Sequence, residues 1–173
     1  MTAGPAALPG LRWSVKVPFL RYIARSPEGR CSVTVDSASV VDEHTFLFSP
    51  DDASAFDADT VTGLLKFRGD VRFAAHYGLL FLSIADPWLS VTGGAGTLTI
   101  AAPPGQSPER IPLTTLHLRT VDPTDTGSCL GTHVRLTAQG SALFNGVYPA
   151  DEPFDDLTLL LTPSSTTVLE KTP

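Results

Sequence analysis

The chain has 173 residues, of which 42% are hydrophobic and 17% charged, a balance that excludes an intrinsically disordered chain and fits one globular domain. Its formal net charge of −6 argues against nucleic acids and anionic membranes as partners, because neither would release counterions on such a surface. The sequence holds no apolar run of the length that a transmembrane helix needs.

Two features of the sequence concern the cellular location of the protein. Residues 1–7 lack the basic and apolar regions of a signal peptide, which predicts a cytoplasmic protein. A leader removed ahead of them would instead place the protein at the cell surface or outside the cell. Cys31 and Cys129 leave the redox state open, since two cysteines form either one disulfide or two thiols.

The first predicted element is a helix over residues 18–24. Pro18 suits its first turn, where the missing N–H costs no hydrogen bond. Phe19, Tyr22 and Ile23 follow the i, i+3, i+4 spacing and are expected to share one helix face. Tyr22 is the unusual member, because an apolar residue would serve a core better.

Most of the remaining chain is predicted to form strands. The acidic stretch 49–60 and the polar segment 122–129 are predicted to be connections, residues 93–96 a glycine hairpin turn, and residues 139–144 a short second helix. We therefore predict a mainly β, single-domain antiparallel sandwich or barrel-like fold with one or two short α-helices. The strands are expected at residues 30–36, 45–48, 60–67, 70–76, 79–85, 88–92, 97–101, 111–118, 133–138 and 157–161.

Four spaced motifs appear in a fixed order. They are L-x-W-x-V-K-x-x-F-x-x-Y-I at residues 11–23, G-x-V-x-F-x-x-H-x-G at residues 69–78, then Asp86-Pro87 and Tyr148-Pro149. Over most of its length the chain thereby resembles the HtaA-type heme-binding domain, a family that takes up heme at the surface of Gram-positive bacteria. The resemblance implies an N-terminal arm at 1–10, an HtaA-like β domain at 11–162 and a flexible tail at 163–173.

The resemblance also implies roles for individual residues. Tyr22 falls on the tyrosine that is the axial ligand of ferric heme, so it is the expected metal ligand. A phenolate is a hard anionic donor that suits Fe(III). From the residue alone, a core tyrosine with a backbone partner is the alternative interpretation.

Further positions complete the expected cofactor site. His76 falls on the histidine that hydrogen-bonds the ligating tyrosine, although ligation of iron by His76 and a structural role both stay open. Tyr148 falls on a position near the heme, with a turn residue as the alternative. Phe19 is a core candidate that also suits contact with the porphyrin. Pro18 departs from the family, which has a serine there that offers a hydroxyl to a heme propionate.

The sequence thus predicts a protein that binds ferric heme b and carries, buffers or takes it up, with a heme donor or acceptor protein as partner and a monomeric or homodimeric state. An intracellular heme-dependent enzyme of redox or biosynthetic type is the alternative, because tyrosine-ligated heme also occurs in catalase. A β-rich interaction module without heme is a third interpretation. His44, His117 and His133 show no spacing typical of a metal site.

Overall fold

The computed structural model describes residues 8–34, 37–103, 105, 109–122 and 125–161. It confirms the predicted mainly β fold with two short helices. The elements are β1 (Gly10–Trp13), α1 (Val17–Arg25), β2 (Arg30–Val33), β3 (Ala38–Val40), β4 (Phe46–Asp57), β5 (Thr62–Arg68), β6 (Asp70–Ala75), the single 3₁₀ turn His76–Gly78, β7 (Leu80–Ala85), β8 (Trp88–Thr92), β9 (Ala95–Ala101), β10 (Arg110–Asp122), β11 (Asp125–Leu136), α2 (Ala138–Leu143) and β12 (Leu157–Leu160).

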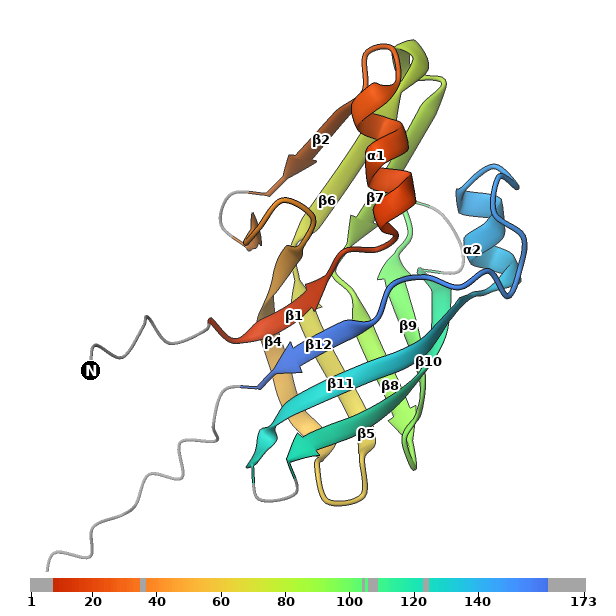
Figure 1. Ribbon diagram of the computed structural model, residues 1–173. Coiled ribbons are helices and arrows are strands. Elements are labelled where there is room, and N and C mark those ends of the chain that lie inside the picture. Colours follow the sequence, from red (N-terminus) through yellow and green to blue (C-terminus); the bar gives the residue numbers. More distant parts are fainter. Residues whose placement is uncertain (1–7, 35–36, 104, 106–108, 123–124, 162–173) are drawn as a thin grey trace, which may run out of the picture.

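The large sheet closes on itself as an antiparallel barrel (Figure 1). Its strands follow the order β1-β12-β11-β10-β9-β8-β5-β4, and β4 returns to pair with β1, while β3 pairs with residues 46–48 at the start of β4. The closing strand β1 is paired on both sides, with Leu11 opposite Leu159 on one side and Phe48 on the other. Closure leaves this part of the sheet without a free edge.

A second sheet of three strands, in the order β2-β6-β7, extends from one end of the barrel (Figure 1). Its inner face carries Val71, Phe73 and Ala75 from β6, all fully buried. Helix α1 lies across this inner face, and the ring of Phe19 meets that of Phe73 edge to face at 5.2 Å. The small sheet is therefore the platform on which α1 is positioned.

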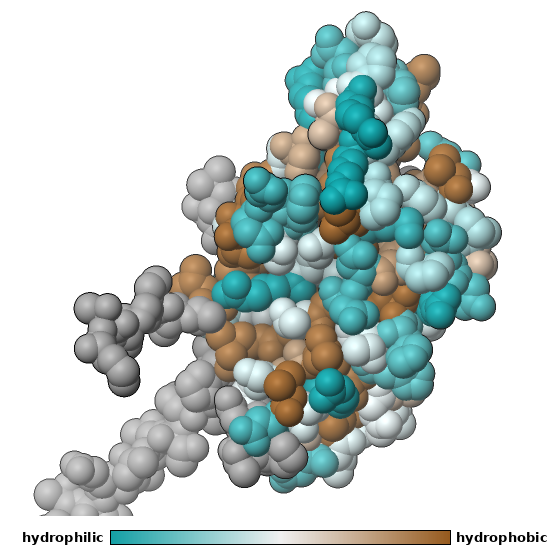
Figure 2. All heavy atoms as spheres, viewed as in Figure 1, coloured by the Kyte–Doolittle hydropathy of each residue, from teal (hydrophilic) through white to brown (hydrophobic). Residues whose placement is uncertain are grey.

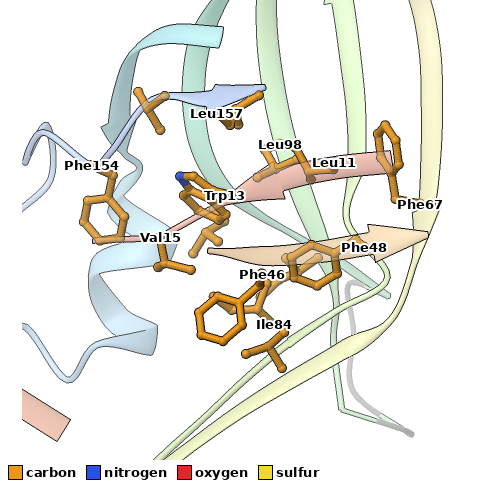
Figure 3. Close-up of a cluster of buried hydrophobic side chains, with 14 of the residues drawn as sticks. Leu11, Trp13, Val15, Phe46, Phe48, Phe67, Ile84, Leu98, Phe154 and Leu157 are labelled. Atoms are coloured by element: carbon orange, nitrogen blue, oxygen red, sulfur yellow. The ribbon is translucent and has the colours of Figure 1, made fainter. Parts of the chain in front are cut away.

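The core is continuous from the barrel to this platform. Figure 3 shows Trp13 and Val15 between the large apolar side chains of several strands. Trp13 is 1% exposed and its Nε1–H donates to the backbone oxygen of Asp155 at 2.8 Å, so the buried indole keeps a hydrogen-bond partner. This contact also fixes the chain that leads into β12 beside the start of α1.

Several sequence predictions about strands were wrong, and the short strand β3 was not predicted at all. The acidic stretch 49–60 is not a connection, because β4 runs through it to Asp57 with its side chains in solvent. The polar segment 122–129 likewise belongs largely to the hairpin of β10 and β11. Strand β1 was missed because its four residues directly precede the helix. In each case, pairing with another strand supplies order that local periodicity does not indicate.

Several predictions fall on residues at the margins of the structure. Residues 1–7 of the predicted arm and the predicted tail after residue 162 lie outside the described residues. Cys31 and Cys129 are both thiols, the first exposed and the second buried. Within the described part of the chain, neither helix has the length and apolar character needed to cross a membrane.

Candidate functional site

Helix α1 is held at its N-terminus by the chain that precedes β12. Lys16 is the N-cap residue and supplies no capping hydrogen bond. Instead the carboxylate of Asp155 accepts from the backbone N–H of Val17 at 2.9 Å, which satisfies an orphan donor and places negative charge at the positive end of the helix. As predicted, Pro18 lies in the first turn.

The helix has two distinct faces. Phe19 and Ile23 are buried against the small sheet, as the sequence predicted. Tyr22 departs from that prediction, because 44% of its surface is exposed. It belongs to an outward row at i, i+3, i+4, i+7 spacing that consists of Pro18, Arg21, Tyr22 and Arg25, all exposed. In Figure 2 the outer surface over α1 is a hydrophilic band.

The side chain of Tyr22 is nevertheless fixed. Its hydroxyl lies 2.5 Å from Nε2 of His76, the residue that directly follows β6, the central strand of the small sheet. The backbone N–H of His76 also donates to the carbonyl of Pro27 at 2.8 Å, so α1 and the loop after it are each joined to the turn after β6. The sequence analysis paired these two side chains, and the structure brings them together.

The turn that carries His76 has an uncommon backbone. His76 and Tyr77 have φ values of 53° and 57°, and Gly78 follows at 86°. Two consecutive non-glycine residues in the left-handed region cost free energy, of order 1 to 3 kcal/mol each, unless their surroundings hold them there. The effect of this backbone is to turn the imidazole away from the course of β6 and toward α1.

Helix α2 and the loop after it carry Tyr148. The side chain of Thr137 caps α2 by accepting from the N–H of Gly140 at 2.8 Å. Ser141 then donates from its hydroxyl to the carbonyl of Tyr148 at 2.6 Å, which fixes the loop. The Tyr148 ring is half-buried, and the ring of Phe19 lies 6.3 Å from it, so Phe19 supports both Tyr148 and the platform below α1.

Tyr148 belongs to the same electrostatic environment as Tyr22. Burial raises the pKa of the Tyr148 phenol above its ordinary value, and negative charge on Glu152 or on Tyr22 raises it further. The influence of Tyr22 on the pKa of Tyr148 indicates that the two phenols, on α1 and on the loop after α2, lie near each other. Among the predicted site residues, Tyr22 contacts His76, Phe19 contacts Tyr148, and Pro18 precedes Phe19 in the first turn of α1.

Lys16 is a contributor that the sequence analysis missed. Its ammonium group lies 5.3 Å from the centre of the Tyr148 ring and 3.3 Å from a carboxylate oxygen of Glu152. It also donates to the carbonyl of Pro153 at 2.8 Å. The sequence could have pointed to Lys16, because the motif at residues 11–23 specifies a lysine at this position. Its role is to tie the start of α1 to the loop that carries Tyr148.

Large hydrophobic side chains are exposed on the two loops that border this end of the molecule. Tyr77 and Leu79, in the turn after β6, are 79% and 85% exposed, and Val147, beside Tyr148, is 67% exposed. The arrangement offers a phenol oxygen with an imidazole beside it, and two exposed arginines on the same helix.

A family model covers nearly all of the described chain. The HtaA family model, described as Htaa, matches residues 10–160, which is most of the chain. The chain belongs to the HtaA family. The match spans β1 through β12 and includes every position of the HtaA-type motifs, from Tyr22 to Tyr148.

Solved structures from Corynebacterium glutamicum share the HtaA fold. The N-terminal domain of HtaA has a TM-score of 0.71 at 21% identity, with 92% of this chain and 100% of that chain covered. The C-terminal domain of HtaA has a TM-score of 0.68 at 23% identity, with coverage of 89% and 98%. Heme binding protein HtaB has a TM-score of 0.65 at 20% identity, with coverage of 88% and 91%. No curated protein matches the chain.

Proposed function

We propose that this HtaA-family domain binds ferric heme b through the Tyr22 oxygen and serves in heme carriage, buffering or uptake. The observation that carries the proposal is the hydrogen bond of 2.5 Å between an exposed phenol and an imidazole. A tyrosine that only filled the core would direct its ring inward, whereas 44% of Tyr22 is in solvent. The similarity in fold to heme binding protein HtaB gives independent support.

The pair has the chemistry that ferric iron requires. A tyrosine oxygen binds Fe(III) as the phenolate, a hard anionic donor. With its proton on Nε2, the His76 imidazole donates a hydrogen bond to that oxygen, which stabilises the charged form and fixes the direction of the ring. His76 is therefore a positioning residue in this proposal, and Tyr22 is the ligand.

The surroundings suit the rest of a porphyrin. Its flat apolar faces would contact Tyr148 and the exposed Val147 beside it, while Phe19 supports the site from below. Its two carboxylates are anionic, and Arg21 and Arg25 lie exposed in the same outward row as Tyr22. Pro18 in that row has no hydroxyl, so the propionate contact expected of the family's serine is absent at this position.

Phenolate ligation also suits a protein that passes heme on. Such a ligand favours the ferric over the ferrous state, so reduction weakens the bond to iron. An exposed site near the molecular surface allows an acceptor protein to approach without opening of the barrel. A heme donor or acceptor is accordingly the proposed protein partner.

The test is an absorption titration with hemin on the intact chain, compared with two single-hydroxyl deletions. The wild type should give the spectrum of tyrosinate-ligated ferric heme with a charge-transfer band in the red. Tyr22→Phe should lose that band and bind at least about 100-fold more weakly. Tyr77→Phe is the matched control, because Tyr77 is adjacent to His76 and 79% exposed, and its spectrum should equal that of the wild type. An unchanged spectrum in Tyr22→Phe would show that the ligand is another residue.

A second measurement tests carriage. Heme-loaded protein is mixed with apomyoglobin, and transfer is followed by the appearance of the myoglobin spectrum, of metmyoglobin without dithionite and of deoxymyoglobin with it. The proposal expects transfer, and faster transfer after reduction. Heme that stays bound in both states would contradict a carrier function while leaving the ligand assignment intact.

A further inference from the structure

The outer wall of the barrel brings together two histidines that lie far from the site of Tyr22 in the fold. His117 is in β10 and His133 in β11, the two strands that form the longest hairpin. The centres of their rings are 5.3 Å apart and the ring planes are inclined by 73°. Their sequence spacing of sixteen residues gives no sign of this contact, which the hairpin alone produces.

A β-bulge places His133 there. Thr132 pairs with His117 and Arg135 pairs with Thr115, so β11 has one residue more than β10 between these two pairs. Gly131 and Val134 both face the interior, and Thr132 and His133 between them therefore both turn outward. Without the extra residue, strict alternation would direct His133 into the barrel.

The backbone at the bulge is strained. His133 has a φ of 52°, in the left-handed region that a non-glycine residue adopts at a cost of about 1 to 2 kcal/mol. The side chain that this strained backbone positions is the exposed imidazole of His133, which contributes nothing to the core. Bulges of this kind often serve to direct one side chain at a functional position.

The two rings have a separation that suits chelation. Zn–N bonds of about 2.1 Å at a tetrahedral angle would put the centres of two imidazole rings about 5 Å apart. The observed 5.3 Å agrees with this value. Thr132 Oγ1 lies 3.2 Å from Nδ1 of His133. With its proton on Nδ1, His133 donates to this hydroxyl and presents the lone pair of Nε2, the arrangement usual for a metal-binding histidine.

The surface around the rings is hollowed and lacks carboxylates among the residues that line it in the described chain. The hollow has a volume of about 350 Å³ and is bordered by the small residues Ala95, Gly96 and Thr97 of the next strand, β9. It leaves room for water ligands. The cation at its edge is Arg135, whose guanidinium donates to the carbonyl of Asp151 at 3.3 Å.

We propose that His117 and His133 together bind one late first-row divalent cation, such as Zn²⁺, with water completing its coordination. Imidazole nitrogens favour these ions, and the lack of lining carboxylates disfavours Mg²⁺ and Ca²⁺. Within the described residues no group of three or more histidine, cysteine or acidic side chains forms a metal cage, so the site has two protein ligands and exchangeable metal. It is independent of the proposed heme site.

The test is calorimetric titration of the heme-free chain with ZnCl₂. The wild type should bind one ion, and His117→Gln and His133→Asn should each weaken binding at least about 10-fold. Asparagine is chosen at position 133 because it tolerates the left-handed backbone, and circular dichroism checks the fold of each variant. His44→Gln and His76→Asn complete the set of four histidines in the sequence, and Cys31→Ser removes the exposed thiol; all three should bind Zn²⁺ like the wild type.

Thermal unfolding gives a second measurement that does not depend on heats of binding. A ligand that binds only the folded state raises Tm with its concentration. Zn²⁺ should raise Tm for the wild type and the control variants, but not for His117→Gln or His133→Asn. Equal Zn²⁺ binding by the wild type and both hairpin variants would overturn the proposal. Loss of binding in the His44, His76 or Cys31 variant would overturn it as well.

Discussion

The hydroxyl oxygen of Tyr22 lies 2.5 Å from Nε2 of His76, and this hydrogen bond joins helix α1 to the end of β6 across 54 residues of sequence. The two side chains reach each other for different reasons. Tyr22 extends from the outward row of a helix fixed at its N-terminus by Asp155. His76 is directed by a left-handed turn. The small sheet holds both α1 and the turn after β6 in place, and without it Tyr22 and His76 would not meet.

His76→Asn tests the role of the imidazole. Asparagine accepts the left-handed backbone of position 76 but donates no comparable hydrogen bond to a phenolate, so hemin affinity should fall by about 10- to 100-fold while Tyr22 still ligates. The measurement is a hemin titration by absorption, with the fold checked by circular dichroism. His44→Asn is the matched control, since His44 is a surface residue in another loop, and it should leave affinity unchanged. Wild-type affinity in His76→Asn would remove His76 from the site.

Pro18→Ser tests the departure from the family pattern. Residue 18 lies in the first turn of α1, where a new N–H needs no helical partner, so the free energy of unfolding should change by less than about 1 kcal/mol. The new hydroxyl is expected to raise hemin affinity by offering a hydrogen bond to a propionate. Pro18→Ala removes the ring without adding the hydroxyl and should show no gain. Equal affinities for the serine and alanine variants would contradict the propionate contact.

Phe19→Ala tests the support beneath the site. The Phe19 ring is 2% exposed and meets the rings of Phe73 and Phe144 at 5.2 and 5.1 Å. Its removal should lower the free energy of unfolding by about 3 to 5 kcal/mol in urea denaturation. Phe81→Ala deletes the same ring where it is 60% exposed and should cost less than about 1 kcal/mol. Similar losses in the two variants would show that α1 is not anchored through Phe19.

The two thiols should react differently. Partial burial of the sulfur removes water from it and raises the pKa of the Cys31 thiol, so less thiolate is present at neutral pH than in an unstructured peptide. Iodoacetamide should therefore modify Cys31 in the native protein slowly, with a rate that keeps rising as the pH passes the ordinary thiol pKa. Cys129 is 1% exposed and should react only after unfolding. Mass spectrometry of the labelled peptides measures both. A rate at Cys31 that levels off below the ordinary thiol pKa would contradict the prediction.

Local patterns were sufficient for part of the fold. The helix at Pro18 and the glycine turn between β8 and β9 were predicted from residues that act on their own neighbours. The course of β4 through the acidic stretch was not, because its exposed aspartates follow no alternation and its order depends on pairs such as Asp52 with Lys66 in β5. Strand β1 was missed for the same reason, since both of its partners lie far along the chain.

The candidate site, like the fold, was predicted from the sequence only in part. Tyr22, His76 and Tyr148 were predicted through the spacing of family motifs, while periodicity alone assigned Tyr22 to the inner helix face. The left-handed turn begins at His76 and Tyr77, neither of which is a glycine, so the sequence does not indicate it. The contact between His117 and His133 depends on a bulge, which the sequence does not indicate. The sequence thus predicted which residues belong to the site. The directions in which their side chains point depend on backbone conformations that form only when the sheets assemble.

The double pairing of β1 has a consequence for engineering. Gly10 lies opposite Leu160, so the first and last strands of the barrel are direct neighbours. A short linker between them would allow circular permutation, with new ends opened at the tight turn of Gly93 and Gly94 on the hairpin of β8 and β9. Such a permutant would retain every strand neighbour of the original, and the same adjacency would let the domain be inserted as a cassette into a loop of another protein.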